Sequence, residues 1–228
     1  MKIDGVIYLD HQATCPLDST VFAEMVPYFD GRFGNPHSSD HAVGWRASQA
    51  VQRAASEVAR LIGADPDEII FTSGATEANN LALLGLAREG LASKRRRILL
   101  SSIEHKCVLE IGRALSAEYG FSIEHLPVDT QGALDLDALE NSIADDVFLV
   151  SVMGANNEIG TIQDIERISR IVGASGAYFH CDADKSLAVS NWAYQVAQAN
   201  SAKLWIANKD HFEHAKPTAE LFTFPNKA

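Results

Sequence analysis

The sequence predicts an α/β fold made of successive strand–helix units around a mainly parallel sheet. Short apolar runs recur along the chain, and segments with helical spacing of apolar residues separate them. Polar residues stand where several of these runs end. Because strand–helix–strand repeats place helices on both faces of a parallel sheet, we expect three layers, with the sheet between two layers of helices.

The expected elements follow in order along the chain. Residues 6–9 form a short extended run, Asp18 caps a helix through about residue 29, and a long helix spans residues 38–62 and ends at Gly63. Apolar residues recur on one face of the long helix, which indicates that it packs against a core. Strands then alternate with helices, the strands at residues 69–73, 97–102, 121–126, 147–153 and 177–181 and the helices at residues 75–92, 106–119, 135–143 and 163–174.

The junction between the 69–73 strand and its helix has the features of a phosphate site. The apolar run ends at Ser73 and Gly74, and the helix begins directly with Ala75 and Thr76. The first turn of a helix has N–H groups without intrahelical acceptors at the positive end of the dipole, and Thr76 adds a hydroxyl. Thr76 as an ordinary first-turn residue is the alternative, and this segment alone does not decide between the two.

Three later strands also end at polar residues. His105 follows the 97–102 strand, Asn157 follows the 147–153 strand, and Asp182 follows the 177–181 strand. In open α/β sheets, ligands bind outside the carboxyl ends of the strands. We therefore expect Thr76, His105, Asn157 and Asp182 to face one edge of the sheet and to bind one ligand.

This set of groups matches the requirements of pyridoxal 5'-phosphate. Beside the phosphate site at Thr76, Asp182 would face the pyridine nitrogen and keep it protonated, which makes the ring an electron sink. His105 would stack on the ring, and Asn157 would donate to the phenolic oxygen.

Six segments, in the same order, resemble the cysteine desulfurases, which are pyridoxal-phosphate enzymes of the class V aminotransferase fold. The segments are YLDHQAT at 8–14, FGNPHSS at 33–39, FTSGATEANN at 71–80, EHK at 104–106, NNEIG at 156–160 and HCD at 180–182. The resemblance covers roughly residues 3–182 and implies the large domain of fold type I. It implies Ala75 and Thr76 at the phosphate, His105 on the ring, Asn157 at the phenolic oxygen and Asp182 at the pyridine nitrogen.

The resemblance also implies an activity and partners. Enzymes of this family take sulfur from L-cysteine, hold it as a persulfide on a cysteine of the enzyme, and release L-alanine. A sulfur-acceptor protein and a homodimer are expected, as is a role in sulfur metabolism and iron–sulfur cluster assembly. The family's reactive cysteine and its substrate-binding arginine lie well beyond residue 228, so the resemblance is to the N-terminal part only and the large domain is expected to be incomplete at the C-terminus.

After Asp182 the resemblance ends. The family pattern continues Asp-Ala-x-Gln, but this chain has Lys185 in place of the glutamine, and near Lys209 it lacks the Ser-x-His-Lys motif that carries the cofactor lysine. All 15 glycines lie at or before Gly176, so the glycine-rich turn that follows this lysine in the family cannot form in the same way. We therefore expect a large domain at residues 1–182 and a divergent tail at residues 183–228.

The tail carries two short apolar runs, at residues 204–207 and 221–224. They are the candidates for the last two strands of the family's sheet, which lie between the 177–181 strand and the 69–73 strand. Without them the 69–73 strand would lose its neighbour and expose two edges.

The tail leaves the catalytic residues unassigned and the activity of this chain doubtful. Lys209 lies close to the family's lysine but lacks the preceding histidine. Two alternatives to a cysteine desulfurase therefore stay open. One is a catalytically inactive pseudoenzyme or binding partner with the same fold, and the other is an enzyme like selenocysteine lyase.

Net charge, the length of the apolar runs and the cysteine content limit which partners and which cellular location we expect. A net charge of −11 argues against nucleic acid and anionic membranes, and no apolar run approaches the ~20 residues of a membrane span. Three cysteines and no signal peptide favour a cytoplasmic protein without disulfides, in which Cys107 and Cys181 are small buried residues. His37 and His41 have no third ligand nearby in the sequence, so no metal site is expected.

Overall fold

Five parallel strands form the main sheet of the computed structural model, which describes residues 2–3, 5–9, 16–183, 204–207 and 220–223. The sheet order is β5-β4-β6-β7-β8. The strands are β4 (Arg97–Ser101), β5 (Ser122–Leu126), β6 (Val147–Ser151), β7 (Tyr178–Asp182) and β8 (Leu204–Ala207). The predicted parallel α/β architecture is confirmed.

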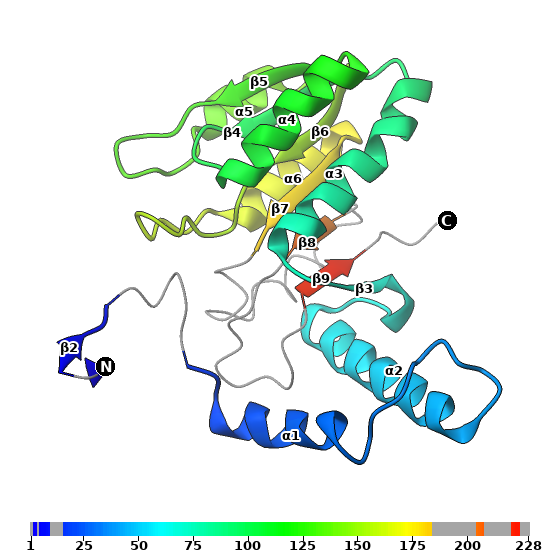
Figure 1. Ribbon diagram of the computed structural model, residues 1–228. Coiled ribbons are helices and arrows are strands. Elements are labelled where there is room, and N and C mark those ends of the chain that lie inside the picture. The colour runs from blue at the N-terminus through cyan, green and yellow to red at the C-terminus, as the bar shows by residue number, and fades with distance from the viewer. Residues whose placement is uncertain (1, 4, 10–15, 184–203, 208–219, 224–228) are drawn as a thin grey trace.

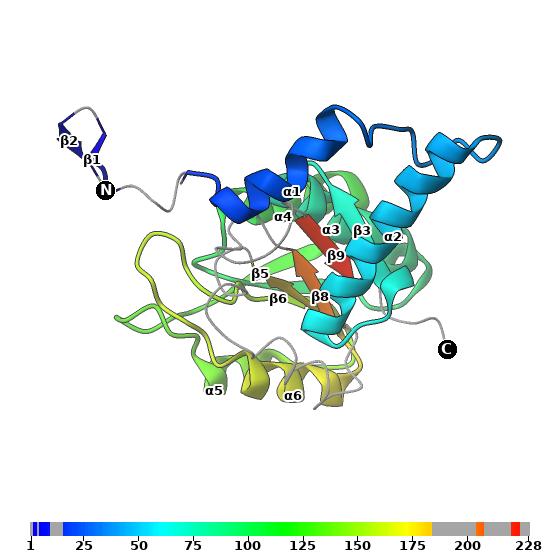
Figure 2. The ribbon, with the colours of Figure 1, turned by 90° about the horizontal axis from the view of Figure 1, so that it is seen from below.

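Helices cover both faces of this sheet, as predicted. Helices α3 (Ala75–Ala92) and α4 (Lys106–Tyr119) lie on one face, and α5 (Leu136–Ser142) and α6 (Ile165–Ser175) lie on the other (Figures 1 and 2). The sequence predicted α3 and α4 to the residue. Within the described residues, no helix is both long enough and apolar enough to cross a membrane.

The N-terminal third precedes the main sheet. It contains the hairpin β1 (Lys2–Ile3) and β2 (Val6–Ile7), then α1 (Ser19–Phe29), α2 (Ala42–Ile62), the 3-10 turn η1 (Pro66–Glu68) and β3 (Ile69–Thr72). Asp18 caps α1 as expected, since its carboxylate accepts from the N–H groups of Thr20 and Val21. Gly63 ends α2 in the left-handed conformation, with φ of 72°.

Helix α2 begins four residues later than predicted. The segment before it is a turn in which the Asn35 side chain accepts from the N–H of His37 at 3.0 Å. The ring of His41 then caps the helix, because its Nδ1 accepts from the N–H of Gly44 at 3.1 Å. Local side-chain hydrogen bonds thus hold residues 35–41 outside the helix.

The two tail strands take the predicted places. Strand β8 pairs with β7, and β9 (Glu220–Thr223) pairs antiparallel with β3, so both lie between β7 and β3 (Figures 1 and 2). Strand β9 begins one residue earlier than the predicted run. The domain boundary at residue 183 stays a prediction, and Lys185 and Lys209 lie outside the described residues.

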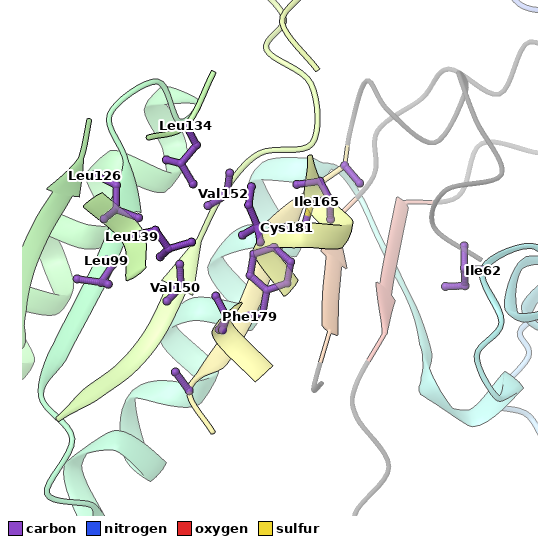
Figure 3. Packing of buried hydrophobic residues seen from close by; sticks show 14 of the residues in the cluster. Ile62, Leu99, Leu126, Leu134, Leu139, Val150, Val152, Ile165, Phe179 and Cys181 are labelled. Carbon is purple, nitrogen blue, oxygen red and sulfur yellow. The ribbon is translucent and has the colours of Figure 1, made fainter. Parts of the chain in front are cut away.

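Two apolar cores lie on the two faces of the sheet. On the α5–α6 side, Leu99, Val150 and Phe179 are fully buried among residues that include Leu139 and Ile165 (Figure 3). On the α3–α4 side, a second cluster joins the helices to the other face of β4 and β6, and its members include Ala82, Leu86, Ile98, Leu100, Ile111 and Leu149.

Strand β7 shows how the alternation of side chains places the site. Phe179 and Cys181 belong to the core on the α5–α6 side (Figure 3). Successive side chains of a strand point to opposite faces, so Tyr178, His180 and Asp182 face α3. Two buried polar side chains therefore lie beneath this helix.

Candidate functional site

The start of α3 offers backbone donors for an anion. Gly74 is the N-cap residue, and no side chain of the described residues forms a cap hydrogen bond at this helix end. The first-turn N–H groups of Ala75 and Thr76 have no intrahelical acceptors. Thr76 is exposed and Ala75 is buried. Helix starts of this kind bind phosphate groups in many proteins, and the phosphate role of Ala75 and Thr76 stays a prediction.

The loop before α3 is held by Glu77. The N–H and the hydroxyl of Ser73 donate to Glu77 Oε2 at 2.7 and 2.5 Å. These two hydrogen bonds, the hydroxyl's first, lower the pKa of the Glu77 carboxyl. Because its charge is engaged by Ser73, Glu77 fixes the turn that presents the helix N-terminus.

Asp182 is a buried carboxylate at the carboxyl end of β7, with 4% of its surface exposed. Its Oδ2 accepts from Asn79 Nδ2 of α3 at 3.0 Å, which places the carboxylate on the α3 face of the sheet. The main chain of Asp182 is also fixed, because its carbonyl accepts from the N–H of Gly154 at 2.8 Å. Asn79 is one helical turn beyond Thr76, so the carboxylate lies beside the first two turns of α3.

His105 is tied to this arrangement through Cys107. His105 is the exposed N-cap residue of α4, and its Nδ1 accepts from the N–H of Cys107 at 3.2 Å. Cys107 Sγ lies 3.0 Å from the same nitrogen and 3.4 Å from Asn79 Nδ2. Since Nδ1 is an acceptor here, a neutral His105 carries its proton on Nε2. Contacts therefore run from His105 through Cys107 and Asn79 to Asp182.

Asn157 lies in the loop after β6, where its Nδ2 donates to Glu158 Oε1 at 3.1 Å. Its neighbour Asn156 is the residue that joins this loop to the His105 loop, because Asn156 Nδ2 donates to the carbonyl of Ile103 at 3.0 Å. Asn156 also closes its own turn by accepting from the N–H groups of Glu158 and Ile159.

Two further polar residues are buried behind Asp182. Ser151 and His180 pair directly across β6 and β7, and Ser151 Oγ lies 2.8 Å from His180 Nδ1. His180 Nε2 lies 3.0 Å from Asn79 Oδ1. Burial lowers the pKa of His180 to about 3, so the ring is neutral at physiological pH.

Glu104 adds a second carboxyl group to this buried region. Its Oε1 accepts from the N–H of Met153 at 2.6 Å, and its Oε2 is buried without a hydrogen-bond partner among the described residues. Burial first, and then the negative charge of Asp182, raise the pKa of Glu104 to about 8. Because this pKa lies above neutrality, Glu104 is mainly protonated at neutral pH.

The structure thus brings Thr76, His105 and Asp182 to the α3 side of the carboxyl edge of the sheet. The sequence analysis assigned no role to Asn79, which joins Asp182 to Cys107. It also gave no role to Glu104, Ser151 and His180, and it described Cys107 as a small buried residue. Cys107 is only partly buried and contacts polar atoms, whereas Cys181 is fully buried in the apolar core, as predicted. One signal was available: Asn79 stands on the buried face of α3 among alanines and leucines, where an amide needs partners.

Comparisons with known proteins identify a family model and relatives that match most of this chain. The family model described as aminotransferase class-V matches residues 7–198. "Cysteine desulfurase IscS" of Rickettsia felis is 52% identical over 176 residues, and "Cysteine desulfurase IscS" of Rickettsia massiliae is 51% identical over 181 residues. The first alignment covers 77% of this chain and 42% of the relative, and the second covers 79% and 44%. The chain therefore spans less than half the length of these relatives.

Solved structures share the fold at moderate identity. A structure of SspA in complex with cysteine superposes with a TM-score of 0.84 at 32% identity, covering 95% of this chain and 60% of SspA. DndA from Streptomyces lividans superposes with a TM-score of 0.80 at 35% identity, covering 95% and 59%. A NifS-like protein gives 0.82 at 34% identity, covering 93% and 57%.

Proposed function

Because this chain belongs to the aminotransferase class-V family, we propose that it binds pyridoxal 5'-phosphate and forms the cofactor-binding part of a cysteine desulfurase. The proposal rests mainly on one observation, the series of contacts that joins His105 to Asp182 through Cys107 and Asn79. It holds an imidazole and a buried carboxylate on one face of the sheet, beside the start of α3.

Each residue has a defined task in this proposal. Ala75 and Thr76 bind the phosphate through the first turn of α3, and His105 stacks on the ring. Asp182 keeps a proton on the pyridine nitrogen, and Asn157 donates to the phenolic oxygen. When bound, the cofactor supplies an electron sink for negative charge at the α-carbon of the substrate. Asn79 contributes by orienting the Asp182 carboxylate, and burial keeps water away from it.

L-cysteine is the proposed substrate, with L-alanine released and sulfur passed to an enzyme persulfide. The relatives named cysteine desulfurase and the SspA structure in complex with cysteine support this choice. We further propose a homodimer, a sulfur-acceptor protein as partner, and a cytoplasmic location. The described cysteines, Cys107 and Cys181, are free thiols, in keeping with a reducing compartment.

Cofactor binding to an Asp182→Asn variant tests the site. Asparagine has nearly the shape of aspartate but no charge, so it cannot hold a protonated pyridine nitrogen. We expect its dissociation constant for pyridoxal phosphate to rise about tenfold or more, the equivalent of one lost charged contact of about 1.4 kcal/mol or more. Fluorescence titration measures the constant.

Asp137→Asn is the matched control. Asp137 is an exposed residue of α5 on the opposite face of the sheet, so this variant should bind like the wild type. Equal affinity of Asp182→Asn and Asp137→Asn would reject the site. Alanine formation from L-cysteine by the loaded protein then tests the activity separately.

A further inference from the structure

The buried residues behind Asp182 form a chain of hydrogen bonds. In each bond, only one of the two groups can be the donor. Three contacts define it: Ser151 Oγ to His180 Nδ1 at 2.8 Å, His180 Nε2 to Asn79 Oδ1 at 3.0 Å, and Asn79 Nδ2 to Asp182 Oδ2 at 3.0 Å. All four side chains are nearly or completely buried, with exposed fractions of 0 to 4%. Water therefore does not compete for these groups.

The direction follows from what each atom can do. An ionised Asp182 only accepts, so Asn79 turns its NH₂ group toward Asp182 and its oxygen toward His180. The amide oxygen only accepts, so His180 Nε2 carries a proton. A neutral imidazole has one N–H, which leaves Nδ1 as an acceptor for the Ser151 hydroxyl.

Glu104 lies beside Ser151, the residue of this chain of hydrogen bonds that is farthest from Asp182. The Ser151 hydroxyl also lies beside the Glu104 carboxyl, but it has a single O–H, which donates a hydrogen bond to Nδ1 of the neutral His180. Glu104 is mainly protonated at neutral pH, so it does not require the Ser151 O–H as a donor. Among the described residues, the Cys107 thiol also contacts Asn79, and burial raises its pKa, so it adds no charge. Cys181, whose pKa burial also raises, points to the opposite face of the sheet.

We propose that Ser151, His180 and Asn79 are positioning residues, a one-way hydrogen-bond relay that holds Asp182 as an oriented, ionised acceptor. In this relay His180 is a neutral Nε2–H tautomer. It accepts a hydrogen bond from Ser151 of β6 and donates one to Asn79 of α3, and so fixes the orientation of the Asn79 amide. The role in cofactor binding rests on the proposed function, whereas the direction of the relay is a property of the protein alone.

The tautomer of His180 tests the direction without any cofactor. Nitrogen NMR of the full chain with labelled histidine, assigned with a His180→Gln variant, should show protonated Nε2 and unprotonated Nδ1 from pH 5 to 8. An Nδ1–H tautomer would reverse every bond and overturn the relay. A ring that gains a second proton near pH 6 would overturn it as well.

Ser151→Ala tests whether the relay reaches Asp182. The variant removes the donor to His180 Nδ1 and touches neither Asp182 nor the anion site. We expect the Nδ1 resonance to shift and the dissociation constant for pyridoxal phosphate to rise a few-fold, by analogy with the loss of one buried hydrogen bond. Asn79→Ala, which removes the last bond of the relay, should raise the constant more.

Ser169→Ala is the matched control, because Ser169 is a fully buried serine of α6 on the other face of the sheet. If Ser151→Ala and Ser169→Ala have the same His180 resonances and the same cofactor affinity, the relay is wrong. If wild-type protein binds no pyridoxal phosphate, the proposed function fails while the His180 tautomer still decides the relay. Should Asn79→Ala not fold, the wild-type tautomer and Ser151→Ala remain decisive.

Discussion

We expect the free energy of unfolding of the wild type to fall between pH 6.5 and pH 8 because Glu104 ionises. Replacing Glu104 with glutamine should abolish this contribution. Burial and Asp182 raise the pKa of Glu104 from its ordinary value of 4.5 to about 8. Between these two values the folded protein holds a proton that the unfolded chain has released. The free energy of unfolding therefore falls as the pH rises through this range.

The size of the effect follows from the two pKa values. One proton of difference changes the free energy of unfolding by about 1.4 kcal/mol per pH unit. Between pH 6.5 and 8, allowing for partial ionisation of the folded form near its pKa, the Glu104 contribution falls by about 1.5 kcal/mol. Glutamine keeps the shape and the acceptor for the Met153 N–H but does not titrate, so its own cost is independent of pH.

His180 changes stability in the opposite direction and at lower pH. Its folded pKa of about 3 lies below the ordinary value of 6.5, so its stabilising contribution is complete above pH 6.5 and is lost as the pH falls toward 3. Both proteins share this contribution, so it cancels when they are compared.

Urea unfolding of wild type and Glu104→Gln at pH 6.5 and pH 8 measures the effect. The difference between the two free energies should change by about 1.5 kcal/mol in favour of the variant. Glu118→Gln, an exposed glutamate of α4, is the control and should show no such change. A Glu104→Gln difference that is equal at both pH values would refute the assignment of a buried, protonated Glu104.

Other predictions concern packing. In α3, a Cβ added at Gly90 would lie 2.5 Å from the ring of Phe121, so Gly90→Ala should lower the free energy of unfolding by about 1–3 kcal/mol. Gly85→Ala in the same helix meets no atom within 4 Å and should raise it by up to about 1 kcal/mol; the reverse order in denaturant unfolding would contradict the packing of α3. Phe179→Ala empties the centre of the α5–α6 core and should cost about 3–5 kcal/mol, and a loss below 1 kcal/mol would show that this core is not formed as described.

Much of the fold could be predicted because its signals are local. The strands follow apolar runs, and the starts and ends of α3 and α4 follow from residues within one turn, such as Gly74 and Gly120. The predicted start of α2 was wrong. The turn at Asn35 and the ring cap of His41 exclude residues 35–41 from the helix, and the helical spacing of apolar residues does not reveal them.

In the candidate site too, some residues could be predicted from the sequence, whereas their contacts could not. Thr76, His105 and Asp182 were found from sequence because each stands at the end of a strand or the start of a helix. Asn157 was found in the same way, but the structure gives the bridging contact to Asn156. The roles assigned to these residues toward a cofactor remain predictions.

The sequence by itself determined the order of strands and helices, the polar residues at the carboxyl edge of the sheet and the two apolar runs of the tail, since each depends on residues a few positions apart. Only the tertiary structure decided the partners of Asp182. Asn79 is 103 residues away from it and Ser151 is 29 residues away from His180. These groups meet because β6 and β7 are neighbours and α3 crosses them, and burial at that crossing then sets which atoms carry protons.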